Sequence, residues 1–174
     1  MTHPPLLGIA GLKNAGKTTL AERLIGELTR RGLTVSSIKH AHHSVDVDEP
    51  GRDSHRHREA GAQEVALVTA RRVALMRELR GEREPTVFEI AARLAPADLV
   101  IVEGFKSSPF PKIEVRRAGM PPLGDAATDI IAIASDTPIQ DASRRVLPLD
   151  DVATIADFII DRFALEAGDA RALG

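Results

Sequence analysis

A glycine-rich segment near the N-terminus has the residue types and the spacing that bind phosphate. Residues 11–18 read GLKNAGKT and match the pattern G-x-x-x-x-G-K-[ST] without a mismatch, between an apolar run and a helical pattern. The glycines let successive backbone N–H groups face an anion, and the N-terminus of the following helix adds partial positive charge. We expect Lys17 to reach the β and γ phosphates, Thr18 to supply a hydroxyl to Mg²⁺ and Thr19 to contact the α phosphate. The nucleotide-binding residues predicted here are Gly11, Lys13, Asn14, Ala15, Gly16, Lys17, Thr18 and Thr19.

An acidic residue follows the most apolar run of the chain. Residues 99–102 read LVIV, which is typical of a central parallel strand buried on both faces, and Glu103 comes next. Ligands of open α/β sheets bind outside the carboxyl ends of the strands, so Glu103 should lie beside the phosphate loop. We predict that Glu103 holds Mg²⁺ through water or polarises the attacking water, and that Lys17 is the other catalytic residue. A loop or helix-capping carboxylate is the alternative interpretation.

A stretch rich in histidine and charge begins where the second predicted strand ends. Residues 39–58 contain five of the six histidines. Asp46 and Asp48 are candidate acids on the Mg²⁺ side of the site. A zinc site is an alternative, but the stretch lacks the His-Glu-x-x-His spacing and the chain has no cysteine; a polar surface loop is another. The residues predicted to contact a second anion or a partner protein are Lys39, His40, His42, His43, Arg56, Arg58 and Lys106.

Asp136 follows another apolar run, at residues 130–134. Many GTP-binding proteins read guanine at this place with the pattern Asn-Lys-x-Asp. This chain has the Asp without the Asn or the Lys. We predict that Asp136 binds the nucleotide, and a turn residue at a strand end is the alternative.

Short apolar runs alternate with helical patterns, which is typical of an α/β domain with a mainly parallel sheet. We predict a P-loop NTPase fold with a mainly parallel central sheet flanked by helices, plus a short antiparallel hairpin, as a single domain over residues 1–174. Strands are expected at residues 6–10, 34–39, 65–68, 73–76, 99–102, 112–116, 130–134 and 146–149. We expect the strand at 112–116 to be more exposed than the others, because its charged and apolar residues alternate. Helices are expected before Gly32 and at residues 53–60, 86–94 and 152–163, the last capped by Asp150 or Asp151.

The composition restricts the classes of function. The 174 residues are 43% hydrophobic and 28% charged, which is ordinary for a globular protein. The absence of cysteine excludes disulfides and a cysteine nucleophile. A net charge of -2 and the lack of Trp and Tyr argue against a nucleic-acid or membrane binder. The average hides a basic part, residues 1–119 with 19 Lys or Arg against 15 Asp or Glu, and an acidic part, residues 120–174 with 4 against 10. With no signal peptide and no apolar run long enough to span a membrane, the expected location is the cytoplasm.

Taken together, these residues resemble the family of the molybdopterin-guanine dinucleotide biosynthesis protein B (MobB). The resemblance runs in order through about residues 5–136 and rests on residues 11–20, 38–43, 50–54, 56, 58, 60–62, 102–106 and 111–114. It implies a dimeric P-loop protein in which residues 1–174 form a single GTP-binding domain. The resemblance also implies that the protein hydrolyses GTP slowly and assists the guanylyltransferase MobA, which joins GMP to molybdopterin. The missing Asn-Lys-x-Asp leaves the base-reading residue open.

Three rival readings remain. A small-molecule P-loop kinase would add an arginine-rich lid, but the arginine-rich segment at residues 71–83 contains an apolar run that predicts a strand in a hairpin. A nucleotide-gated metallochaperone would use the histidines to deliver a metal. A binding module that never hydrolyses GTP is the third. The short chain leaves no obvious room for a separate substrate domain, which favours a nucleotide-dependent accessory protein over a self-sufficient transferase.

Overall fold

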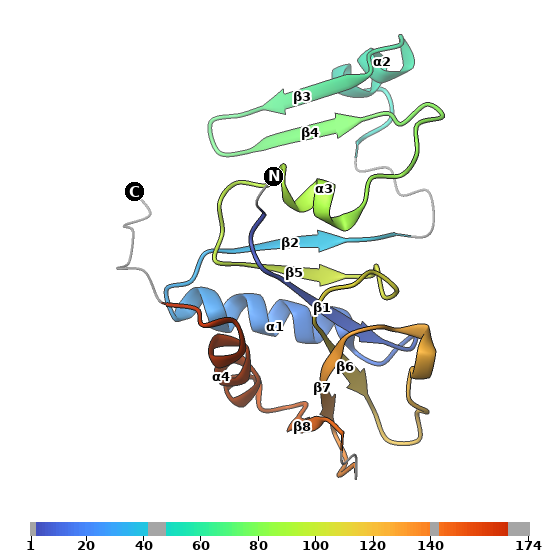
Figure 1. The fold of residues 1–174 in the computed structure, drawn as a ribbon. Helices are drawn as coiled ribbons and strands as arrows, with labels where there is room; N and C mark the ends of the chain where they lie inside the picture. Colours follow the sequence, from blue (N-terminus) through green and yellow to red (C-terminus); the bar gives the residue numbers. More distant parts are fainter. Residues whose placement is uncertain (1–2, 42–47, 140–142, 167–174) are drawn as a thin grey trace. The chain divides into compact units, whose positions relative to one another are not determined.

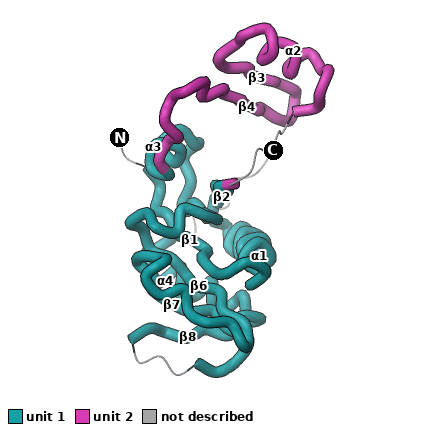
Figure 2. Tube along the Cα trace, turned by 90° about the vertical axis from the view of Figure 1, so that its right-hand side faces the viewer, with its two compact units in different colours: residues 1–40, 87–174 teal, residues 41–86 magenta. Residues whose placement is uncertain are grey.

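A computed structural model describes residues 3–41, 48–139 and 143–166. The chain forms a six-stranded parallel sheet with helices and a separate two-stranded antiparallel hairpin (Figure 1). It divides into two compact units, residues 1–40 with 87–174 and residues 41–86 (Figure 2). The predicted fold class is confirmed. The single GTP-binding domain over residues 1–174 stays a prediction, because a division of the chain into compact units does not test what the chain binds or how many functional domains it has.

The large sheet has the strand order β2-β5-β1-β6-β7-β8, and every neighbouring pair is parallel. The chain leaves β1 toward β2 on one side and later crosses from β5 to β6 on the other. The central strand β1 therefore lies at the point where the strand order reverses, which is where such sheets bind ligands. The bounds are β1 Leu6–Gly11, β2 Val35–Lys39, β5 Leu99–Glu103, β6 Lys112–Arg116, β7 Ile130–Ser135 and β8 Arg145–Pro148.

Two amphipathic helices cover one face of this sheet. They are α1, Lys17–Arg30, and α4, Val152–Phe163. Leu24 and Leu28 of α1 and Ile155 of α4 are fully buried in one cluster with Leu7 of β1. Burial of each such side chain is worth about 1.5–3 kcal/mol. The predicted cap of the last helix is confirmed, since Asp151 accepts a hydrogen bond of 3.0 Å from the Thr154 backbone N–H.

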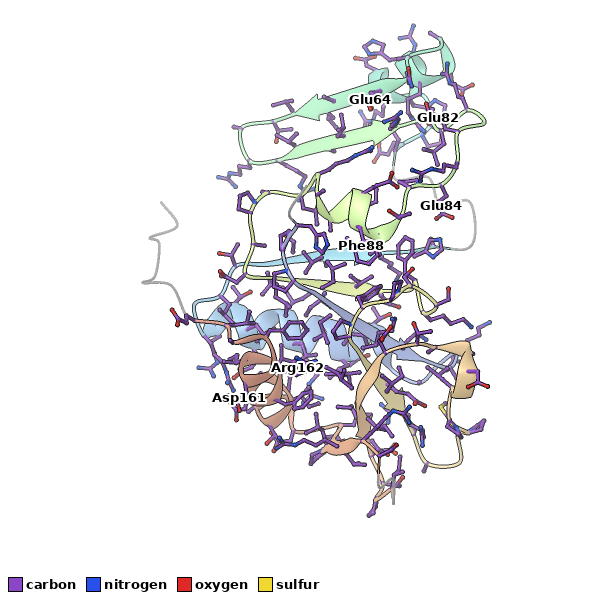
Figure 3. The ribbon with its side chains drawn as sticks, viewed as in Figure 1. Glu64, Glu82, Glu84, Phe88, Asp161 and Arg162 are labelled. Carbon is purple, nitrogen blue, oxygen red and sulfur yellow. The ribbon has the colours of Figure 1, made fainter. Side chains whose placement is uncertain are left out.

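The opposite face is covered by a short helix and by loops. Helix α3, Val87–Ala91, is shorter than the predicted 86–94. Phe88, labelled in Figure 3, lies on this helix. The Phe88 ring meets that of Phe110 edge to face, with 6.3 Å between ring centroids. Farther along this face lies the 3-10 turn η1, Gly124–Ala126.

The expectation that residues 112–116 form a more exposed strand is wrong. Strand β6 lies inside the sheet between β1 and β7, with Lys112 fully buried and Glu114 4% exposed. The charges are satisfied internally. Glu114 accepts two hydrogen bonds from Arg116 at 2.8 and 2.9 Å, and the Lys112 ammonium donates to three backbone carbonyls. In this strand, the alternation of charged and apolar residues therefore indicates buried charges that have hydrogen-bond partners. It does not indicate a side of the strand that faces solvent.

The smaller unit contains α2, Asp53–Glu59, and the predicted hairpin of β3, Glu64–Val68, with β4, Val73–Arg77. The two strands pair antiparallel with Val68 opposite Val73. Arg77 forms ion pairs with Glu64 at 3.6 Å and with Glu82 at 2.7 Å (Figure 3). One hairpin face bears exposed apolar side chains, with exposed fractions of 67% for Val68, 70% for Val73 and 65% for Leu75.

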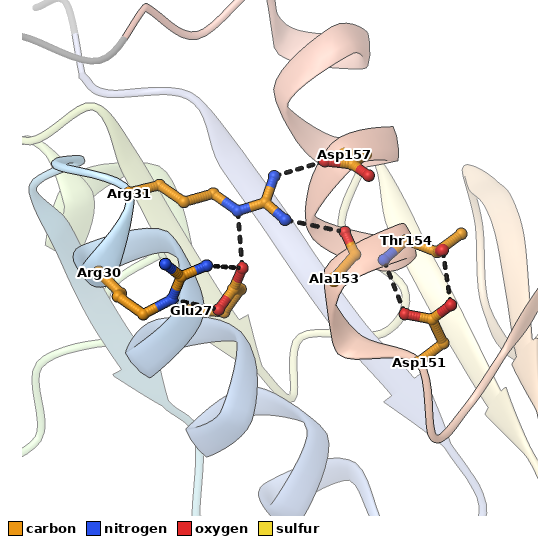
Figure 4. Close-up of polar contacts among 7 residues, drawn as sticks. All are labelled: Glu27, Arg30, Arg31, Asp151, Ala153, Thr154 and Asp157. Carbon is orange, nitrogen blue, oxygen red and sulfur yellow. Dashed lines mark hydrogen bonds and ion pairs between the residues drawn. The ribbon is translucent and has the colours of Figure 1, made fainter.

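An ion-pair cluster joins the C-terminal end of α1 to α4 (Figure 4). Arg31, directly after α1, donates to Glu27 at 2.8 Å, to Asp157 at 2.5 Å and to the Ala153 carbonyl at 3.2 Å. Arg30 adds two further bonds to Glu27. These bonds to the charged form hold the pKa of Glu27 at about 2, below its ordinary value of 4.5.

In the described part of the chain, no helix is both long and apolar enough to cross a membrane.

Candidate phosphate-binding site

The phosphate loop connects β1 to α1 at the carboxyl edge of the sheet. Gly16 precedes the helix with a φ of 97°, a left-handed conformation that glycine adopts without strain. The Ala15 N–H donates to the Leu12 carbonyl at 3.2 Å and closes the loop. The Lys17 ammonium also donates to the Leu12 carbonyl, at 2.8 Å. Lys17 therefore lies folded over its own loop, at the place where an anion held by the loop would be neutralised.

A hydroxyl and a carboxylate meet next to this loop. Thr18 Oγ1 donates to Glu103 Oε1 at 2.9 Å and lies 3.1 Å from Oε2. Glu103 ends β5, which pairs with β1, so the sheet register places it beside the loop as predicted. Lys39, at the end of β2, lies opposite Glu103, with its Nζ 4.0 Å from Oε2. Hydroxyl and carboxylate oxygens are the ligands that Mg²⁺ prefers, so Thr18 and Glu103 fit a magnesium site.

The backbone after Glu103 is fixed by close packing against β2. The His40 N–H donates to the Glu103 carbonyl at 2.8 Å, and the His40 ring stacks on Phe105 with 4.3 Å between centroids. Gly104 has a φ of 105°, and a Cβ on it would lie 2.5 Å from the His40 Cβ. Only glycine fits this contact. His40 therefore packs against the turn that carries Glu103.

Arg117 contacts the loop and was not predicted. Its Nε donates to the Ala15 carbonyl at 3.2 Å, and its Nη1 lies 3.3 Å from Asp136 Oδ2. Asp136 also accepts a bond of 2.8 Å from the Ala118 N–H. Its position directly after a predicted strand could have suggested a role for Arg117 at the site. Because we expected that strand to be exposed, we did not place Arg117 near the phosphate loop.

Other predicted residues lie in the smaller unit. Arg58 pairs with Asp48 at 3.3 Å and with Glu78 at 2.7 Å, and Ser54 donates to Asp48 at 2.8 Å. Arg56 pairs with Asp53 at 3.7 Å on α2. These side chains contact one another within that unit, so the roles of Asp48, Arg56 and Arg58 toward an anion or Mg²⁺ stay predictions.

Residues 42–47 of the histidine stretch lie outside the part of the chain that the structure describes. They include the predicted His42, His43 and Asp46. Within residues 3–41, 48–139 and 143–166, no group of three or more His, Asp or Glu could hold a metal ion. Lys13, Thr19 and Lys106 are exposed, in the phosphate loop, in the first turn of α1 and in the loop after β5. The roles of these residues, and that of Asn14, stay predictions.

A phosphate loop between the first strand of a parallel sheet and its helix defines a P-loop α/β protein. Residues 6–136 match the model of the family described as Molybdopterin guanine dinucleotide synthesis protein B, MobB. The chain belongs to this family.

Individual relatives agree over most of the chain. It is similar to the molybdopterin-guanine dinucleotide biosynthesis adapter protein of Haemophilus influenzae, with 42% identity over 89% of this chain and 87% of the relative. The adapter protein of that name from Escherichia coli is 38% identical over 92% of this chain and 94% of its own length. Among solved structures, a molybdopterin-guanine biosynthesis protein B superposes with a TM-score of 0.74 at 27% identity, covering 91% of this chain and 99% of its own.

Proposed function

We propose that the protein is an adapter in molybdopterin-guanine dinucleotide biosynthesis that binds GTP with Mg²⁺ at the phosphate loop. In this role it assists a MobA-like guanylyltransferase as that enzyme attaches GMP to molybdopterin in the cytoplasm. The adapter part is supported by family membership and by the printed names of relatives at 42% and 38% identity. The observation that carries the nucleotide part is the contact between Thr18 and Glu103 beside the loop.

The side chains at the loop have distinct tasks in this proposal. Lys17 exchanges the Leu12 carbonyl for the β and γ phosphates, since an ammonium bonds more strongly to an anion than to a neutral oxygen. Thr18 would supply a hydroxyl to Mg²⁺, and Glu103 would hold the ion through water or polarise the attacking water. Mg²⁺ supplies neutralisation of the phosphate charge when bound. Arg117, which contacts the loop, bonds to the Ala15 carbonyl and to Asp136, so we expect the hydrolysis of GTP to be slow.

A second anion site completes the proposed role. The Lys39 ammonium is 65% exposed beside Glu103, at the end of β2 where the histidine stretch begins. Together with His40 and Lys106 of the same unit, it would bind the phosphate of molybdopterin or an acidic surface of the transferase. The phosphate loop would then present GTP, and the cations would present molybdopterin, to one partner enzyme.

We also propose a homodimer. The apolar hairpin face of Val68, Val73 and Leu75 is exposed in the described chain. A second copy of this face would remove it from water, and apolar burial of this kind stabilises homodimers.

A reconstituted transfer assay tests the proposed function. Purified guanylyltransferase, molybdopterin and Mg²⁺–GTP are combined with the wild-type chain, Lys17→Ala or Glu103→Gln. We expect the wild type to increase the rate of molybdopterin-guanine dinucleotide formation and both variants to lose most of that increase. Arg93→Ala, which removes an exposed cation from the segment after α3, is the control and should act like the wild type. Full stimulation by Lys17→Ala would show that the adapter does not work through a bound nucleotide.

A further inference from the structure

Arg117 reaches the phosphate loop from the neighbouring strand. Strand β6 pairs with β1 so that Val115 lies opposite Gly11, the first residue of the loop, and Arg117 follows two residues later. Its Nε donates to the Ala15 carbonyl at 3.2 Å, and its Nη2 lies 3.2 Å from the place of a Cβ on Gly16. The guanidinium therefore packs against the two residues that precede Lys17.

The same guanidinium holds the carboxylate of Asp136. Nη1 of Arg117 lies 3.3 Å from Oδ2, and the backbone N–H of Ala118 donates to Oδ1 at 2.8 Å. Asp136 follows β7, which pairs with β6 on the side away from β1. One arginine thus joins the carboxyl ends of three adjacent strands at the edge where the loop lies.

We propose that Arg117 is a positioning residue for the nucleotide, an inference that rests on the proposed function. It fixes the Ala15–Gly16 backbone and Asp136 in one arrangement, so that less conformational freedom is lost when the loop binds phosphates. Preorganisation of this kind strengthens binding without a new contact to the ligand. The planar guanidinium is suited to the task because its donors reach two acceptors in different directions, which an ammonium does less well.

The partners of Arg117 allow its role to be separated from that of Lys17. The Asp136 carboxylate that Arg117→Ala leaves behind is 23% exposed, so water reaches it, and it keeps its bond from the Ala118 N–H. Loss of Arg117 should therefore weaken nucleotide binding without unfolding the protein. Since Arg117 and Asp136 act as one unit, their effects on affinity should not add.

Calorimetric titration of Mg²⁺–GTP into the full chain tests this proposal. The variants are Arg117→Ala, Arg117→Lys, Asp136→Ala and the double variant Arg117→Ala with Asp136→Ala, with Arg93→Ala as the control. We expect Arg117→Ala to raise the Kd for Mg²⁺–GTP about tenfold at unchanged stoichiometry. The Kd of Arg117→Lys should lie between those of Arg117→Ala and the wild type. The Kd of the double variant should stay within about threefold of that of the weaker-binding single variant. A merely structural role would lower the fraction of binding-competent protein, and hence the stoichiometry, while leaving Kd unchanged.

The outcomes separate this proposal from the one on which it rests. The role of Arg117 alone is overturned by one set of results: the wild type binds GTP, Lys17→Ala does not, and Arg117→Ala has a Kd for GTP within twofold of the wild-type value. Additive effects of Arg117→Ala and Asp136→Ala on Kd overturn it as well. A wild type that binds no GTP overturns both. Should Arg117→Ala fail to fold, Arg117→Lys decides, since a Kd equal to the wild type would contradict a need for the guanidinium.

Discussion

Lys112 shows how a charged residue can belong to the core of this sheet. Its ammonium donates to the carbonyls of Ser108, Phe110 and Thr128 at 2.5, 2.8 and 3.2 Å, and its stem fills the space left by Gly8 on β1. Burial lowers the pKa of Lys112 from its ordinary value of 10.5, although Asp129 opposes this shift. One amine therefore links the crossover from β5 to β6 with the segment that precedes β7.

Replacement of Lys112 should destabilise the fold. Lys112→Met leaves buried carbonyls without their donor, so we expect the free energy of unfolding to fall by about 2–3 kcal/mol. Because the folded pKa lies below the unfolded value, the unfolded state binds more protons in the interval below 10.5, and wild-type stability should rise with pH there. Denaturant titrations between neutral and alkaline pH measure both effects. Lys106→Met, at an exposed lysine of the same crossover, keeps Lys112 and should retain both the wild-type stability and its rise with pH. Equal stability of the two variants would contradict the role of Lys112.

Gly104 offers a second test at a single residue. A Cβ at this position would meet the His40 Cβ at 2.5 Å in a backbone conformation with a φ of 105°. We expect Gly104→Ala to cost about 1–3 kcal/mol of stability and, by moving the turn after Glu103, to weaken Mg²⁺-dependent nucleotide binding. Gly26→Ala is the matched control, because nothing lies within 4 Å of its added Cβ in α1. That variant should be neutral or about 0.5–1 kcal/mol more stable. The interpretation of Gly104 fails if its variant melts and binds like Gly26→Ala.

Among the elements, the α1–α4 contact depends on a carboxylate with a low pKa. Glu27 has a folded pKa of about 2 against an ordinary 4.5, so its contribution is complete above pH 4.5 and is lost as the pH falls toward 2. We expect Glu27→Gln to be less stable than the wild type at neutral pH, with a difference that disappears over this interval. Unfolding free energies from pH 7 to pH 2 measure this, with Glu22→Gln on the exposed side of α1 as the control. A difference that stays constant with pH would rule out the ionised Glu27 as its source.

The elements also show where sequence patterns succeed. Helix α4 was predicted with its observed bounds because its apolar residues follow a helical period and Asp151 begins it. The hairpin was predicted because two short apolar runs flank a tight turn. Strand β6 was misjudged because periodicity records polarity and not the partners of a charge, and Lys112 and Glu114 have partners up to 16 residues away.

The candidate site also contains residues that the sequence predicts and a residue that it does not. The phosphate loop and Glu103 were predictable, since each is read from one segment and a general rule of sheet topology. Arg117 was not, because its importance depends on β6 lying beside β1, and a single sequence does not state strand order.

At the scale of the whole molecule, the hairpin face predicts self-association. Val73→Asp places a charge in an apolar surface that a second copy would cover, so we expect it to shift the protein from dimer to monomer in sedimentation velocity at micromolar concentration. Ala70→Asp, in the turn of the same hairpin, should leave the dimer intact. A monomeric wild type, or a dimeric Val73→Asp, would contradict the proposed interface.

The central claim is that the phosphate loop of this MobB-family chain binds GTP with Mg²⁺. Calorimetry with GTP and with ATP, each in the presence of Mg²⁺ and each repeated on Lys17→Ala, tests it most directly. We predict one GTP per chain, weaker binding of ATP and no measurable binding of either nucleotide to Lys17→Ala. A preference for ATP, or unchanged GTP affinity in Lys17→Ala, would contradict the account.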